Sequence, residues 1–146
     1  MILIKVIILA IASVLKFIFG YEGVNLLFRV SPSRLIIAVL RRYGAEIGSC
    51  VRIQSPFLIH NADQIEPIYS NLIIGNNCYI GRDCIFDLMD KITIGDQVTI
   101  SHRAILNTHT NAGKSPLSKT TFKPTVGSIN IKDGAYLGTN VTVLES

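Results

Sequence analysis

The stretch Ile73–Phe86 reads IIGNNCYIGRDCIF and repeats itself every six residues. The aliphatic–glycine pair at 74–75 recurs at 80–81. The cysteine that follows the first pair, Cys78, recurs in the same place as Cys84. A helix has a period near 3.6 residues and a strand a period of 2, so neither alone produces this pattern. A fixed repeat indicates small structural units that stack on one another.

The same frame continues along most of the chain. Each unit opens with a large apolar residue, its lead, and usually carries a small residue in the fifth place. The leads are Ile47, Ile53, Ile59, Ile74, Ile80, Phe86, Ile94, Ile100, Leu106, Ile131, Leu137 and Val143. Several leads are followed by glycine, which tolerates turn conformations that other residues avoid. Three units are expected to close one triangular rung, with rungs at about residues 47–64, 74–93, 94–111 and 131–146.

The pattern predicts a mainly β fold, a parallel β-helix. The leads point inward and stack on their copies in neighbouring rungs, because no rung can bury its apolar face alone. Cys78 and Cys84 take the small inward place and are expected to be apolar fillers. Cys50 falls outside that place, and its role is open. Three cysteines without a CxxC pair do not indicate a secreted disulfide framework.

Three segments, IIGNNCYIGRDCIF, KITIGDQVTISHRAIL and INIKDGAYLGTNVTVLES, resemble the hexapeptide-repeat acyltransferases. The resemblance covers roughly residues 45–146 and is nearest to the maltose and galactoside acetyltransferase-like branch of sugar and polysaccharide O-acetyltransferases. It implies a left-handed β-helix, a homotrimer, acetyl-CoA as the acyl donor and no metal. The family continues beyond VTVLES with a further rung, so the resemblance also implies a C-terminus that is truncated.

One histidine stands where chemistry is expected. The segment at 112–128, AGKSPLSKTTFKPTVGS, cannot continue the stack and is predicted to leave it as a loop. His109 lies just before this loop, and histidine suits a general base at neutral pH. In the resembling enzymes a histidine at this point takes the proton of the acceptor hydroxyl, which implies that role for His109. His102 is the second candidate, and His60 is expected to be structural or exposed.

The remaining site predictions follow from the resemblance. The AYLGTNV segment implies contacts to coenzyme A from Tyr136, Gly138 and Thr139. Lysines of the loop could meet its phosphates or could be solvated charges: Lys114, Lys119 and Lys123. The residues that hold the sugar in galactoside acetyltransferases are replaced by Gly81 and Met89, so free galactosides are not the expected substrates. Asp87, close by, is the candidate to hydrogen-bond a different sugar.

The N-terminal segment is apolar and basic. Residues 1–46 carry six cations and two acidic groups, whereas the rest carries eight of each sign, so the net charge of +4 belongs to the first third. Residues 1–20 are predicted to form a helix with Lys5 and Lys16 on one narrow stripe, which suits a helix at a membrane surface. A spanning helix, a cleaved signal and a buried core helix are the alternatives. The neutral remainder lacks the aromatic and basic pattern of a nucleic-acid site.

Residues 21–44 are predicted as a linker followed by an amphipathic helix. Ser31 is the expected N-cap, Pro32 the first helical residue and Gly44 the stop. Arg41 and Arg42 lie near its C-terminal end, where the helix dipole favours cations. The organisation is therefore two N-terminal helices and a β-helix domain at 45–146.

The function that these features indicate is an acetyl-CoA-dependent O-acetyltransferase at the cytoplasmic side of a membrane. Its acceptor would be a saccharide hydroxyl of a capsule, O-antigen or exopolysaccharide precursor, which could be lipid-linked. A catalytically silent trimeric scaffold or fragment is the second hypothesis. A serine-acetyltransferase-like enzyme that acts on a small metabolite is the third, although a soluble metabolite gives no reason for the apolar N-terminus.

Overall fold

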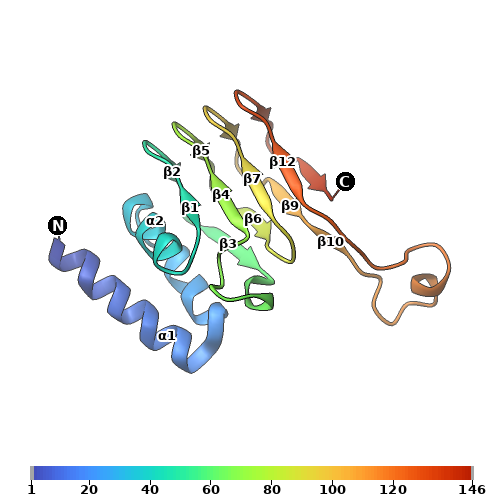
Figure 1. Cartoon of the computed structure of the whole chain (residues 1–146), viewed down its shortest axis with the longest axis horizontal. Coiled ribbons are helices and arrows are strands. Elements are labelled where there is room, and N and C mark those ends of the chain that lie inside the picture. Colours follow the sequence, from blue (N-terminus) through green and yellow to red (C-terminus); the bar gives the residue numbers. More distant parts are fainter. Residues whose placement is uncertain (1, 146) are drawn as a thin grey trace.

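The computed structural model describes residues 2–145, and Figure 1 shows two helices followed by a stack of short strands. The helices are α1 (Ile2–Phe28) and α2 (Ser33–Arg42). Twelve of the strands form three parallel sheets, each with one strand from every rung. The first sheet has β1 (Glu46–Ile47), β4 (Leu72–Ile74), β7 (Ile92–Ile94) and β12 (Ile129–Ile131). The second sheet has β2 (Arg52–Ile53), β5 (Tyr79–Ile80), β8 (Thr99–Ile100) and β13 (Tyr136–Leu137). The third sheet has β3 (Phe57–His60), β6 (Cys84–Asp87), β9 (Ile105–Asn107) and β14 (Thr142–Leu144).

The register of these sheets confirms the six-residue frame. In the first sheet Ile47 is aligned with Ile74, which is aligned with Ile94, which in turn is aligned with Ile131. The leads of the other two sheets are aligned in the same way. Most leads are fully buried, and burying each such side chain stabilises the fold by roughly 1.5–3 kcal/mol. The stacked leads are therefore the core.

Four of the small fifth places, in the second and third rungs, are also buried, as predicted. Cys78, Cys84, Val98 and Ala104 all lie in the core. Burial raises the pKa of both cysteine thiols, which makes them poor nucleophiles. They are fillers in this structure, and Cys50 is exposed.

Glycine is required after the leads for a different reason from the expected one. The left-handed backbone conformation occurs two residues after these glycines, for example at Asn77 and Asp83. A Cβ on Gly75 would lie 2.7 Å from the backbone of the next rung, and a Cβ on Gly81 would lie 2.6 Å from the His102 nitrogen. Glycine is needed there because adjacent rungs approach closely, not because the turn requires a positive φ.

Helix α1 has two halves, separated by a non-helical residue at Gly20 (φ 63°). The second half extends to Phe28, so residues 21–28 belong to a helix and not to the expected linker. Val24 and Phe28 are buried, and the Asn25 side chain donates a hydrogen bond to the Ile59 carbonyl at 2.7 Å. This half closes the first rung of the β-helix.

Part of the predicted polar stripe on the first half of α1 contacts the protein. Ala12 is buried, the Ser13 hydroxyl lies 3.1 Å from that of Tyr43, and Lys16 forms an ion pair with Glu66 at 2.9 Å. The stripe was expected to face water; Lys5 is exposed, as expected, whereas Ser13 and Lys16 contact the body of the protein because their partners lie there. The outward surface of this half is apolar and exposed; it comprises Leu3, Ile4, Val6, Ile7, Ile11, Val14, Phe17 and Ile18.

The remaining elements refine the predicted connections. Helix α2 begins one residue later than predicted, with Pro32 in the N-cap position and Ser31 buried without capping it. Gly44 (φ 106°) follows its end, as expected. A short helical turn, η1 (Ala62–Gln64), leads from the first rung to the second.

The predicted loop leaves the stack as an arm. Its base is an antiparallel pair of strands, β10 (His109–Thr110) and β11 (Thr125–Val126). Its tip contains a second helical turn, η2 (Pro116–Lys119). Figure 1 shows this arm extending away from the third and fourth rungs. His109 is therefore the first residue of the arm.

Candidate active site

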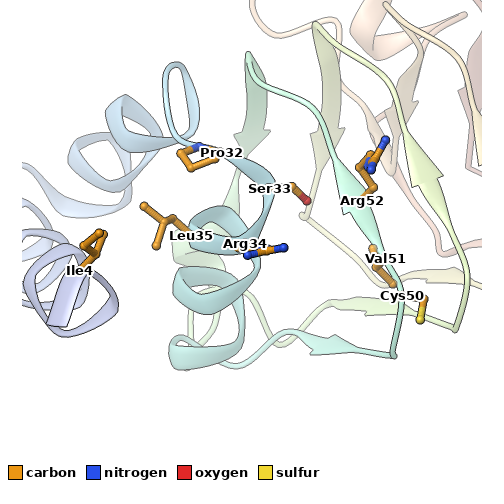
Figure 2. A pocket seen from close by; sticks show the side chains of 8 residues that line it. All are labelled: Ile4, Pro32, Ser33, Arg34, Leu35, Cys50, Val51 and Arg52. Carbon is orange, nitrogen blue, oxygen red and sulfur yellow. The ribbon is translucent and has the colours of Figure 1, made fainter. Parts of the chain in front are cut away.

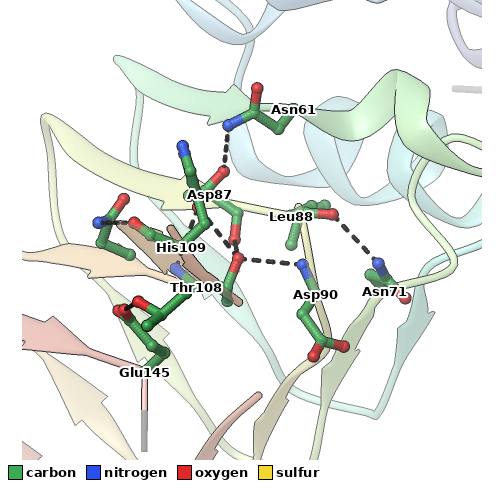
Figure 3. Close-up of polar contacts among 10 residues, drawn as sticks. Asn61, Asn71, Asp87, Leu88, Asp90, Thr108, His109 and Glu145 are labelled. Carbon is green, nitrogen blue, oxygen red and sulfur yellow. Dashed lines mark hydrogen bonds and ion pairs between the residues drawn. The ribbon is translucent and has the colours of Figure 1, made fainter. Parts of the chain in front are cut away.

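His109 contacts a buried carboxylate. Its Nδ1 atom lies 2.6 Å from Oδ2 of Asp87, which is the last residue of β6 on the rung below (Figure 3). The His109 side chain is 27% exposed, whereas that of Asp87 is 4% exposed. The ring is thus anchored on its inner nitrogen and accessible from outside.

Asp87 is held by groups from two distant parts of the chain. The Asn61 amide donates to Oδ1 at 2.5 Å. The Thr108 backbone N–H donates to Oδ2 at 3.0 Å, and the Thr108 hydroxyl lies 3.0 Å from the same oxygen. Burial alone would raise the pKa of Asp87, but the hydrogen bonds from His109, Asn61 and Thr108 together lower it. Asp87 is therefore ionised at neutral pH.

An ionised carboxylate only accepts hydrogen bonds, which fixes the tautomer of His109. Nδ1 must carry the proton, and Nε2 is left with its lone pair. A neutral imidazole of this kind can take a proton at Nε2, and Asp87 then stabilises the imidazolium that forms. The pair has the arrangement of a general base with a residue that orients it.

Nearby groups fix the backbone around the histidine. The Asn107 side chain donates to the His109 carbonyl at 2.5 Å, and Gly127 donates to the Thr108 carbonyl at 3.0 Å. On the fourth rung, Glu145 accepts a hydrogen bond from Thr125 of β11, which lowers the pKa of Glu145. The base of the arm is therefore fastened to both adjoining rungs.

Asp87 was expected to bind a sugar, and the structure places it behind the His109 ring instead. Both of its oxygens accept hydrogen bonds from protein groups. A buried acceptor that is already satisfied has little to offer a ligand hydroxyl. The geometry favours a positioning role for Asp87 over direct contact with a saccharide.

Sequence reasoning missed the support that Asn61 and Thr108 give to Asp87. A usable signal was present, because the strand register aligns His60 with Asp87 and Phe86 with Leu106. Extending both registers to Leu88, by one place from His60 and by two from Leu106, brings Asn61 and Thr108 to the end of β6. The three residues are far apart in sequence and adjacent only in the folded stack.

The other histidines have weaker surroundings. His102 is exposed, and its Nε2 lies 3.4 Å from the Thr139 hydroxyl. His60 is exposed at the end of β3. Within residues 2–145, no three histidine, cysteine or acidic side chains converge in a way that could hold a metal ion.

The predicted coenzyme residues lie on a different sheet from His109. Tyr136 is on β13 and is 70% exposed, with its hydroxyl 3.2 Å from that of Ser101. Gly138 follows β13, and a Cβ there would meet nothing within 4 Å. With Thr139 these residues form an open surface, here called the β13 ledge. Lys114, Lys119 and Lys123 are exposed on the arm.

Comparisons with known proteins agree with the fold. Neither the protein-family models nor the curated proteins searched gave a match. The hexapeptide-repeat-containing acetyltransferase VCA0836 from Vibrio cholerae superposes with a TM-score of 0.70 at 19% identity, over 92% of this chain and 72% of that chain. Its complex with acetyl coenzyme A, from V. cholerae O1 biovar eltor, superposes with a TM-score of 0.55 at 17% identity and the same coverage. The chain thus has the predicted left-handed β-helix fold of a hexapeptide-repeat acetyltransferase.

Proposed function

We propose that the chain is an acetyl-CoA-dependent O-acetyltransferase that uses His109 as its general base. The observation that carries this proposal is the Asp87–His109 contact of 2.6 Å at the base of the arm. It supplies a partly exposed imidazole with a fixed tautomer, on a fold that the chain shares with a solved acetyltransferase. A scaffold that only packs against copies of itself would not need this arrangement.

In the proposed reaction one proton moves twice, first from the acceptor hydroxyl to His109 and then from His109 to the sulfur of coenzyme A. Acetyl-CoA supplies an electrophilic thioester carbonyl. Nε2 of His109 takes the proton of the acceptor hydroxyl as its oxygen forms a bond to that carbonyl carbon. The imidazolium, held by Asp87, then gives this proton to the sulfur as the carbon–sulfur bond breaks. The products are an ester and free coenzyme A, and His109 returns to its neutral form.

The β13 ledge is the proposed place for coenzyme A. It fits as an exposed surface with an aromatic side chain and two hydroxyls, and Gly138 leaves room for a ligand to lie close to the backbone. No contact among the described residues links the ledge to His109. In a homotrimer, which we also propose, the ledge of one copy would face the His109 of the next, so that each site needs two chains.

The proposed acceptor is a saccharide hydroxyl of a capsule, O-antigen or exopolysaccharide precursor at the cytoplasmic face of a membrane. Residues Leu3–Phe28 form a helix long and apolar enough to cross a bilayer. Only 6% of its most apolar 18-residue segment is buried inside the protein. Lys16 of this helix is paired with Glu66, and the outward arc of α1 is apolar and exposed, which suits contact with lipid. Such a helix would hold the active site near lipid-linked sugars.

Thiol release from acetyl-CoA tests this function. The full chain, in a mild detergent, is mixed with acetyl-CoA and a panel of hydroxyl-bearing saccharides, with serine and an amino sugar as discriminating acceptors. We expect release of coenzyme A with at least one saccharide hydroxyl and loss of that release in His109→Ala. Release with serine or the amine alone would overturn the saccharide assignment. No release with any acceptor would overturn acyl transfer.

A further inference from the structure

A groove lies between the two N-terminal helices and the first rung, far from the His109 pair. It has a volume of about 720 Å³. Its walls come from α1, from α2 and from the corner before β2, as Figure 2 shows. The lining residues are Ile4, Pro32, Ser33, Arg34, Leu35, Cys50, Val51 and Arg52.

One wall of the groove is apolar and continues onto the outward surface of α1. Ile4 and Leu35 face each other across the gap between the helices (Figure 2). Ile4 is also part of the exposed apolar arc of α1. The apolar arc of α1 is therefore continuous with the groove at Ile4.

The groove is also lined by two cations. Arg34 of α2 and Arg52 of β2 both line the groove and are both exposed. Arg52 takes part in neither of the two ion pairs found among residues 2–145, which are Lys16–Glu66 and His109–Asp87. No acidic residue lines the groove. A guanidinium presents several N–H donors in one plane and suits a phosphate group.

We propose that this groove binds the phosphate headgroup of an anionic phospholipid, with the acyl chains along the apolar arc of α1. The observations that support it are the apolar side of the groove, which is continuous with the exposed arc of α1, and the two arginines that also line it. The inference rests on the proposed membrane contact of α1 and is independent of acyl transfer. It would fix the depth and orientation of the protein on the bilayer.

One residue of the groove, Cys50, can be labelled with a fluorescent probe. Cys50 lines the groove and is exposed, whereas Cys78 and Cys84 are buried with raised pKa values. A thiol-reactive fluorophore should therefore label Cys50 selectively. An environment-sensitive dye at this position reports whether the groove is in contact with lipid.

The experiment uses the labelled full chain with vesicles of neutral phosphatidylcholine and vesicles that also contain phosphatidylglycerol. Co-sedimentation of the unlabelled chain is measured in parallel. We expect a blue shift of the dye and about 30-fold tighter binding with the anionic vesicles, because each of the two arginines contributes about 1 kcal/mol near such a surface. Arg52→Gln should lower that preference about fivefold.

A matched variant separates a built site from general surface charge. Arg42→Gln removes the same charge from α2 at a residue that does not line the groove. It should change the preference for anionic vesicles by less than about twofold. Equal losses in the two variants, or equal binding to both kinds of vesicle, would overturn the proposal.

Two further outcomes are decisive. If millimolar inorganic phosphate gives the same blue shift without vesicles, the groove binds free phosphate and the lipid assignment is wrong. If the full chain binds no vesicle at all, the membrane contact of α1 is refuted and the groove proposal with it. Thiol release from acetyl-CoA is measured separately, so a failure of acyl transfer would remain distinguishable from either result.

Discussion

Two turns of the third rung each carry a histidine, and only one of the two rings contacts a buried carboxylate. His102 lies between β8 and β9, exposed, with a threonine hydroxyl 3.4 Å from its Nε2. His109 lies after β9, with a buried carboxylate 2.6 Å from its Nδ1. The residue type is the same, and what differs is the group behind the ring. The proposed base role of His109 rests on this buried acceptor, which a neighbouring rung supplies and which orients the ring.

The difference between the turns comes from the layer below each of them. Beneath His102 lies the Gly81 turn, where the backbone approaches closely and leaves no room even for a Cβ. Beneath His109 lies the end of β6, where Asp87 is held by Asn61 and Thr108. The Gly81 turn packs closely against His102, whereas the end of β6 presents the Asp87 carboxylate to His109. Substitutions in both turns can therefore test this contrast.

The largest effect is expected from His109→Ala. Removal of a general base typically lowers the rate by about 10²–10⁴-fold. Thiol release with an accepted saccharide should fall by that factor, while the melting temperature changes little because the ring is partly exposed. Turnover within threefold of the unsubstituted protein would contradict the assignment.

Asp87→Asn should have the next largest effect on activity. The asparagine amide can donate to Nδ1, which would favour the tautomer with its proton on Nε2, the wrong form for a base. We expect the rate of thiol release to fall by at least about 10-fold, and by no more than it falls in His109→Ala. The pH–rate profile should also change, which a purely structural role would not produce. An unchanged profile with normal turnover would show that Asp87 does not act through His109.

Two glycines give a matched pair for stability. Gly81→Ala would place a Cβ 2.6 Å from the His102 nitrogen, whereas Gly138→Ala would meet nothing within 4 Å. Overpacking of this kind lowers the free energy of unfolding by roughly 1–3 kcal/mol. Denaturant unfolding should therefore show a loss in the first variant and a change below about 0.5 kcal/mol in the second. Equal losses would mean that the rungs do not approach as closely as described.

The Asp87 pair also predicts how stability changes in acid. The folded-state pKa of Asp87 is lowered from its usual value. Its contribution to stability is therefore complete above the unfolded-state pKa of about 3.9 and is lost as the pH falls through the lowered folded-state value. Between about pH 5 and pH 2, the free energy of unfolding should fall less steeply in Asp87→Asn than in the unsubstituted protein. Parallel curves for the two proteins would contradict the ionised pair.

The smallest effect is expected from His102→Ala. Its ring has no buried carboxylate behind it, and its one hydrogen bond is long and exposed. Thiol release should stay within about threefold, and the unfolding free energy within about 0.5 kcal/mol. A loss as large as that of His109→Ala would reverse the comparison between the two turns.

The sequence alone predicts the stack because each lead repeats the same physical requirement. Ile80 and Ile100 occupy equivalent places, and the structure aligns and buries both. The position of His109 before the arm also follows from where the frame breaks. These predictions depend on spacing along the chain, which a sequence displays directly.

What sequence reasoning could not supply depends on contacts between distant segments. The support of Asp87 by Asn61 arises only when the first rung lies against the second. The direction of the Lys16 stripe depends on Glu66, whose position no local pattern reveals. The need for Gly75 lies in the backbone of the rung beside it, so a local argument about turns gave the wrong reason.

Calorimetric titration of acetyl-CoA into the full chain tests the central claim most directly, because it needs no knowledge of the acceptor. We predict saturable binding, with similar affinity in His109→Ala, since that side chain acts on the proton and not on the donor. Tyr136→Ala should weaken the binding, because Tyr136 lies on the proposed ledge. Absence of binding in the unsubstituted chain would contradict an acetyl-CoA-dependent acyltransferase.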